Sequence, residues 1–131
     1  MAEPALPDAV RIVVDHLEAA NLPLIGARVY GFELPPVPTY PAVRVQRFGG
    51  ANVVNQRLDG ARLQIEVWGG TAEEAWDATA SVRAELWDLE GTVAGTGTVT
   101  GIEELSGPAW LPDPRTERAR WTWDIRLYAH N

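Results

Sequence analysis

Residues 120–127 alternate apolar and polar side chains, and this period of two constrains the fold more than any other feature of the sequence. One side of the pattern holds Trp121, Trp123, Ile125 and Leu127, and the other holds Arg120, Thr122, Asp124 and Arg126. Successive side chains of a β-strand point to opposite faces, so the segment predicts a strand with one apolar face. A sheet built on such a strand needs another layer over that face.

A second alternation predicts a partner strand in the middle of the chain. Leu63, Ile65 and Val67 alternate with Arg62, Gln64 and Glu66. Residues 43–48 precede it as a further apolar strand, and Gly49-Gly50 interrupts that strand. We therefore expect a hairpin with a long tip over residues 49–60, and shorter strands within 25–34 and 98–105.

Two segments have the spacing of helices. An apolar stripe at i, i+3, i+4 and i+7 after Asp8 predicts a helix over residues 9–20 with Asp8 as its N-cap. Thr71 and Glu74 form a capping box that opens a helix over 72–89. Its inward stripe comprises Ala75, Ala78, Thr79, Val82, Leu86 and Leu89.

The order of these elements is α-β-β-β-α-β-β, and hairpin-length links favour antiparallel pairing. We expect an α+β fold in a single domain over residues 1–131. Its sheet is mostly antiparallel, with two helices packed on one face.

Composition excludes several classes of function. The chain has 18 acidic and 11 basic residues, a formal net charge of −7, and no cysteine. All the basic residues are arginines, so catalysis by a lysine is excluded. The absence of cysteine excludes thiolate metal sites. An acidic chain also makes a nucleic acid a poor default partner. The first residues do not resemble a signal peptide, and no apolar run reaches the roughly 18 residues of a membrane helix, so we expect a cytoplasmic protein.

Candidates for catalysis or metal binding are few. His16 falls in the middle of the first predicted helix, and His130 is next to the last residue. Glu73, Glu74 and Asp77 cluster on one helical turn, where capping and solubility explain them. We predict no catalytic residue, no cofactor and no metal site.

The six tryptophans require an explanation beyond the core. Trp121 and Trp123 fit the apolar side of the last strand, but Trp68 falls on the polar side of its own strand. Trp76 and Trp87 lie off the inward stripe of the second helix, and Trp110 lies in a proline-bounded segment. Tryptophan and arginine are common anchors of protein interfaces, although such rings also cap the rims of small cores. The predicted subunit interface comprises Trp68, Trp76, Arg83, Trp87, Trp110 and Leu111.

Two stretches carry a family resemblance. Residues 63–75 read LQIEVWGGTAEEA and continue into VRAEL at 82–86, and residues 104–113 read ELSGPAWLPD before the tryptophan-rich last strand. From the first helix to the final strand, the chain resembles the tail terminator (tail completion) proteins of long-tailed bacteriophages, particularly those that infect actinobacteria.

This resemblance implies a virion structural protein with no reaction and no cofactor. Tail terminators form a ring, commonly six-fold, on the last ring of the tail tube, where they stop polymerisation and join the tail to the head. The implied partners are further copies of the chain, the tail tube protein and a head–tail connector or neck protein. The implied location is the head-proximal end of the tail, after assembly in the host cytoplasm.

A ring needs two different patches on each subunit. We expect one patch at Trp76, Arg83 and Trp87, and the other at Trp110-Leu111. The tube or neck contact loop is expected at the hairpin tip, with Asn52, Asn55, Gln56 and Arg57. An acidic lumen would let DNA pass without specific binding.

Two alternatives stay open at this point. One is a head–tail connector or neck subunit. The other is a small α+β ligand-binding or enzyme domain with a tryptophan-lined pocket.

Overall fold

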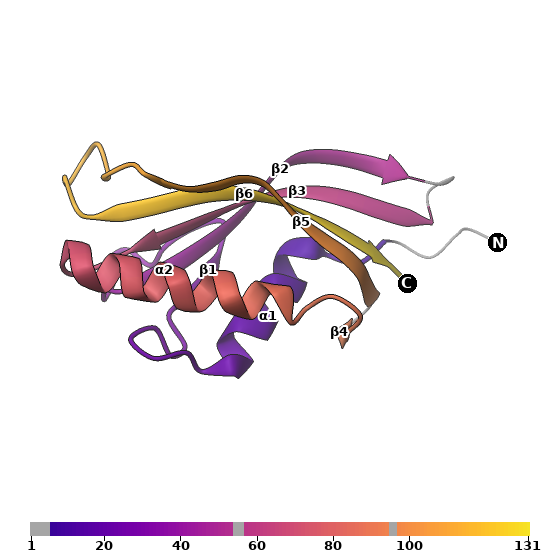
Figure 1. The fold of residues 1–131 in the computed structure, drawn as a ribbon, viewed down its shortest axis with the longest axis horizontal. Coiled ribbons are helices and arrows are strands. Elements are labelled where there is room, and N and C mark those ends of the chain that lie inside the picture. Colours follow the sequence, from indigo (N-terminus) through magenta and orange to yellow (C-terminus); the bar gives the residue numbers. More distant parts are fainter. Residues whose placement is uncertain (1–5, 54–56, 95–96) are drawn as a thin grey trace.

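The computed structural model describes residues 6–53, 57–94 and 97–131 (Figure 1). The elements in chain order are α1 (Ala9–Ala20), β1 (Val29–Gly31), β2 (Ala42–Val53), β3 (Leu58–Trp68), α2 (Ala72–Trp87), β4 (Val93–Ala94), β5 (Gly97–Trp110) and β6 (Arg120–His130). They form a 6-stranded sheet in the order β1-β2-β3-β6-β5-β4. Only β1 and β2 pair in parallel.

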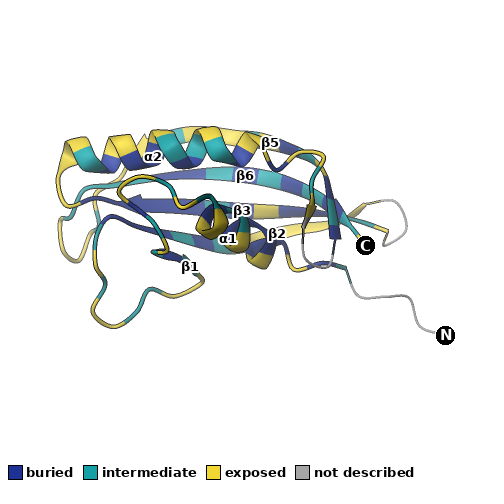
Figure 2. Cartoon of the chain, turned by 90° about the horizontal axis from the view of Figure 1, so that it is seen from below, coloured by how far each residue is buried: buried dark blue, intermediate teal, exposed yellow. Residues whose placement is uncertain are grey.

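Both helices lie against the same face of the sheet (Figures 1 and 2). The α+β class, the mostly antiparallel sheet and the order of elements are confirmed, with the two-residue β4 as an addition. The core lies between the sheet and the helices. In β3 and β6, Leu63 pairs with Ile125 and Ile65 with Trp123, and all four side chains are buried. The predicted inward stripe of α2 is buried throughout.

The helix starts follow from side-chain caps, as predicted. The Asp8 carboxylate accepts a hydrogen bond of 3.1 Å from the backbone N–H of Arg11. The Thr71 hydroxyl accepts one of 3.1 Å from the backbone N–H of Glu74. Each cap satisfies a donor that the first turn of a helix leaves free. The second helix ends at Trp87, slightly before the predicted position, and Leu89 is buried in the turn that follows.

The predicted long tip over residues 49–60 is wrong. Strands β2 and β3 continue through most of this range, and Asn52 pairs with Asp59. Gly49 and Gly50 adopt φ of 95° and 90°, where the register shifts, so the pair forms a bulge rather than ending the strand. A Cβ on Gly50 would lie 2.1 Å from the carbonyl oxygen of Gly60, so only glycine fits there.

The strand expected within residues 98–105 is longer than predicted. Strand β5 continues to Trp110 through three register shifts, and Trp110 pairs with Trp121. The β5–β6 connection therefore begins only at residue 111. In the first half of the chain, the strand expected within 25–34 is limited to Val29–Gly31.

Candidate functional site

Three tryptophans contact one another at one end of the helix-bearing side of the sheet. The ring centroids of Trp76 and Trp121 lie 4.7 Å apart at an interplanar angle of 57°. Those of Trp110 and Trp121 lie 5.5 Å apart at 66°. The outer two rings stay 43% and 45% exposed, for Trp76 and Trp110 respectively. Tilted contacts of this kind stabilise aromatic pairs, so the cluster is a fixed surface feature.

The same surface continues along α2. Arg83 pairs with Glu104 of β5 through two hydrogen bonds, of 2.5 Å from Nε and 2.9 Å from Nη2. The hydrogen bond to Glu104 raises the pKa of Arg83, which keeps the guanidinium charged. Trp87, which is 45% exposed, lines a small crevice beside this ion pair. We name the whole set the tryptophan surface: Trp76, Arg83, Trp87, Trp110, Leu111 and Trp121.

The sequence analysis placed Trp76, Arg83 and Trp87 in one patch and Trp110-Leu111 in another, and the structure joins the two patches through Trp121. Trp121 connects Trp76 of α2 to Trp110 of β5. Sequence analysis did not assign the half-buried Trp121 to this surface, because Trp121 fits the apolar alternation of β6. The signal that could have found it was the pairing of Trp110 with Trp121, which requires β5 to reach residue 110.

The expectation that Trp68 is exposed is wrong. Its ring is 2% exposed, on the face of the sheet away from the helices. The indole N–H donates a hydrogen bond of 3.0 Å to Asp113, and the guanidinium carbons of Arg44 and Arg120 lie 5.1 Å and 5.7 Å from the ring centroid. Segments remote in sequence therefore cover this side chain, which removes it from the candidate interface.

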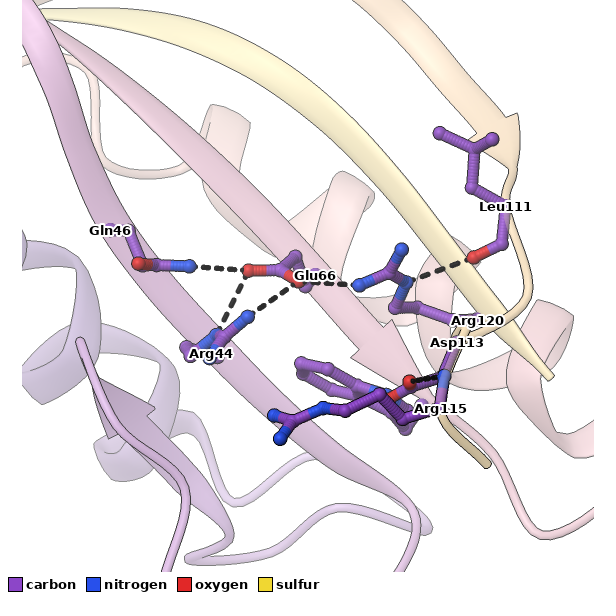
Figure 3. Close-up of polar contacts among 8 residues, drawn as sticks. Arg44, Gln46, Glu66, Leu111, Asp113, Arg115 and Arg120 are labelled. Atoms are coloured by element: carbon purple, nitrogen blue, oxygen red, sulfur yellow. Dashed lines mark hydrogen bonds and ion pairs between the residues drawn. The ribbon is translucent and has the colours of Figure 1, made fainter. Parts of the chain in front are cut away.

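A buried carboxylate organises that face (Figure 3). Glu66 is 2% exposed and accepts bonds of 2.9 and 2.8 Å from Arg44. It also accepts bonds of 2.7 Å from Gln46 and 3.0 Å from Arg120. Charge-assisted bonds to both oxygens offset the cost of burying the charge. Sequence analysis did not find this network, although β2–β3 pairing places Arg44 opposite Glu66.

Asp113 joins the network from the β5–β6 connection. Burial opposes its ionisation. Hydrogen bonds from the backbone N–H of Arg115 and the indole of Trp68, with the charge of Arg120, outweigh burial and hold the pKa of Asp113 below its ordinary value. Asp113 is thus a charged acceptor that ties the connection to Trp68.

These groups form the floor and rim of a hollow of about 620 Å³. Its walls are the proline-rich segment after β1 and the turn after Asp113. At its edge the guanidinium of Arg118 stacks on Tyr40, 3.9 Å from the ring centroid. The lining residues are Glu33, Leu34, Pro35, Pro36, Pro38, Tyr40, Arg44, Trp68, Asp113, Pro114, Arg115, Thr116 and Arg120.

The candidate histidine of the first helix lies between the two helices. His16 Nε2 lies 3.0 Å from Glu85 Oε1. Among the described residues, no group of three or more acidic or histidine side chains is arranged to hold a metal ion. Within the same ranges, neither α1 nor α2 is long and apolar enough to cross a membrane.

Two of the four residues of the predicted contact loop lie within the described part of the chain. Asn52 is exposed at the end of β2, and Arg57 is exposed in the turn before β3. Asn55 and Gln56 lie outside the described residues.

Comparison with known proteins decides the family. A family model described as "Tail completion protein gp17" matches residues 11–130. The chain belongs to the tail completion protein gp17 family. This tail completion protein is therefore a structural protein of a phage tail, as the resemblance implied.

The fold of this tail completion protein has solved relatives. A protein chain in the structure of the virion of a native gene transfer agent particle superposes with a TM-score of 0.62 at 20% identity. The match covers 94% of this chain and 95% of the other, so the two share a fold over nearly their whole length. A search of curated protein sequences found no match.

Proposed function

We propose that this protein is a tail terminator that forms a closed ring, most simply a hexamer, on the last ring of the tail tube. The ring stops tube polymerisation and joins the tail to the head or neck. Membership of the tail completion family supports this role, and so does the shared fold with a chain of a gene transfer agent virion. The observation that carries it is the tryptophan surface, which leaves three indole rings nearly half exposed.

The exposed rings provide a driving force for association. Each large ring offers roughly 250 Å² of surface, so three rings exposed by 43–45% leave about 330 Å² in contact with water. Burying that area contributes about 8 kcal/mol at ~25 cal/mol per Å². Association costs about 4–15 kcal/mol in lost freedom of motion, so the rings alone do not make a tight complex. A complementary patch on the neighbouring subunit must supply the remainder.

We place that second patch at the opposite edge of the sheet, beside β1. A ring needs two different surfaces on each subunit. The two patches predicted from the sequence form a single tryptophan surface, so the second surface must lie elsewhere. At the β1 edge, Phe32 is 53% exposed and borders a hollow of about 300 Å³ with Val10 and Val14 of α1. Strand β1 lies at one end of the strand order, and β5 with the two-residue β4 lies at the other, as head-to-tail contacts require.

The outer end of the β2–β3 hairpin is the proposed contact with the tail tube or neck protein. Residues 47–53 of β2 are exposed on both faces, so this part of the hairpin lies beyond the helical layer (Figure 1). Asn52 and Arg57 present polar groups there. Asn55 and Gln56 belong to the same proposed contact.

The remaining parts of the proposal follow from the role as a ring. The protein acts without a reaction or cofactor, at the head-proximal end of the tail. Its net charge of −7 suits a lumen that DNA crosses without specific binding. An actinobacterial host stays a prediction.

Native mass spectrometry of the purified protein tests ring formation. We expect one closed stoichiometry in the wild type and monomers for Trp76→Asp. The control, Val93→Asp, places the same charge on another residue, which is 81% exposed and lies in β4, and should keep the ring. A monomeric wild type at tens of micromolar would contradict the ring. Electron microscopy of particles made without the protein then separates the roles, because overlong tubes indicate a terminator and tails of normal length indicate a connector or neck subunit.

A further inference from the structure

Charge is unevenly distributed over this acidic protein. Its hollow on the helix-free face gathers four of the 11 arginines, Arg44, Arg115, Arg118 and Arg120. Among the described residues, the acidic residues at the same place are Glu33, Glu66 and Asp113, with Glu117 in the turn beside Arg118. The rest of the chain has a large excess of acids. We name this region the arginine hollow.

Two of these acidic residues, Glu66 and Asp113, already have donors. Glu66 takes bonds from Arg44, Gln46 and Arg120, so two guanidiniums share one carboxylate. Asp113 accepts from Trp68 and from the backbone N–H of Arg115. The carboxylates of Glu66 and Asp113 are therefore occupied by other donors, and Glu33 forms no ion pair with the arginines of the rim in the part of the chain that the structure describes.

The rim arginines lack acidic partners. Among the described residues, no carboxylate forms an ion pair with Arg115 or Arg118. The Nε of Arg118 is buried and has no hydrogen-bond partner, while its guanidinium lies over Tyr40. Figure 3 shows Arg115 extending from the turn in the direction of Arg44. Guanidiniums without an acidic partner leave charge-assisted donors that an incoming carboxylate can use.

The walls suit an extended peptide. Pro35, Pro36 and Pro38 restrict the backbone on one side, so little conformational freedom is lost when a ligand binds. Tyr40 and Trp68 add aromatic surface to the cationic groups. A volume of about 620 Å³ accommodates a short segment of polypeptide rather than a single ion.

We propose that the arginine hollow binds an extended acidic segment of another virion protein, whose carboxylate is held by Arg115 and Arg118. This inference rests on the proposed virion role, which supplies the source of the partner. DNA fits less well, because phosphate backbones need many positive charges and the surrounding chain is acidic. A second copy of this chain is the competing occupant that the test must exclude, because its acidic surface would meet the same arginines.

The test is a titration of the ¹⁵N-labelled full chain followed by NMR. The probe is the synthetic peptide acetyl-Gly-Glu-Pro-Asp-Glu-Gly-amide, and its matched control replaces each acid with the corresponding amide. We expect the acidic peptide to shift the indole N–H signal of Trp68 and the Nε–H signal of Arg118. The amide peptide should leave both signals in place.

A pair of variants separates the hollow from general charge effects. Arg115→Gln should weaken peptide binding about fivefold, the value of one exposed ion pair of ~1 kcal/mol. Arg11→Gln removes the same charge from α1, where the side chain is 72% exposed and pairs with Asp15, and should bind as wild type. Equal affinity of Arg115→Gln and wild type would overturn the proposal. Tighter binding of a 12-base-pair DNA duplex at the same signals would also overturn it, as would shifts that depend only on protein concentration.

The same titration on the Trp76→Asp variant keeps this inference distinct from the ring. The tryptophan surface and the hollow lie on opposite faces of the sheet, so a monomeric variant should retain the peptide site. Peptide binding without a ring would contradict only the proposed function. A ring without peptide binding would contradict only the hollow.

Discussion

Replacing Glu66 with glutamine keeps the shape of the side chain and removes its charge. In the wild type, one carboxylate joins Arg44 of β2 to Arg120 of β6 across β3. Removing one member of a buried ion pair costs about 3–5 kcal/mol, because the remaining charges lose their partner. Here the arginine side chains are 26% and 17% exposed, so both regain part of their hydration. We therefore expect a loss just below that range, about 2–3 kcal/mol.

That loss should be large enough to measure by heat and by denaturant. With an unfolding entropy of ~2.1 cal/mol/K per residue, a chain of 131 residues should melt about 7–11 °C lower. Urea unfolding of the same variant should give a lower midpoint with an unchanged slope.

A matched variant shows whether the effect belongs to the buried network. Glu103→Gln makes the same change in a side chain that is 49% exposed and lies 3.7 Å from Arg126. An exposed pair is worth about 0–1 kcal/mol, so this variant should melt close to the wild type. Equal losses in the two variants would refute the reasoning, because burial would then contribute nothing.

Three further predictions concern local structure. The pKa of Asp113 is lowered from 3.8, so its stabilising effect is present above that pH and is lost as the pH falls through the folded value. The melting temperature of Asp113→Asn should therefore fall less steeply with decreasing pH than that of the wild type, and an equally steep fall would contradict this. Gly50→Ala should cost more than Gly49→Ala in urea unfolding, because both have positive φ but only Gly50 lies against backbone; equal midpoints would argue against the clash. Thr71→Ala should cost about 1 kcal/mol through loss of the helix cap, and Thr71→Ser, which keeps the hydroxyl, should recover most of it by the same assay.

Local patterns were sufficient to predict the helices and the order of elements along the chain. The caps at Asp8 and Thr71 and the apolar stripe of α2 depend on residues close in sequence, and all of them are confirmed. The strand ends were less predictable. Gly49-Gly50 has the composition of a turn, but it forms a bulge because Gly60 of the partner strand lies against it.

The candidate site was predicted only in part, because its contacts join distant segments. The exposure of Trp76 and Trp87 followed from their position on the helix, and that of Trp110 was expected from its proline-bounded segment, although Trp110 ends strand β5. The burial of Trp68 did not, because Asp113 and Arg120 reach it from the other half of the chain. Pairings of that separation leave no periodic signal in the sequence.

Strand β6 serves both proposed surfaces through neighbouring residues, with Arg120 toward the hollow and Trp121 toward the exposed rings. A slip of this strand by one position would turn an indole toward Glu66 and a guanidinium toward Trp76. Both contact surfaces would then be destroyed together. Under the proposed function, a copy with the wrong alignment would fit neither the next subunit of the ring nor the acidic segment, so the alignment of this strand would decide whether a subunit is incorporated.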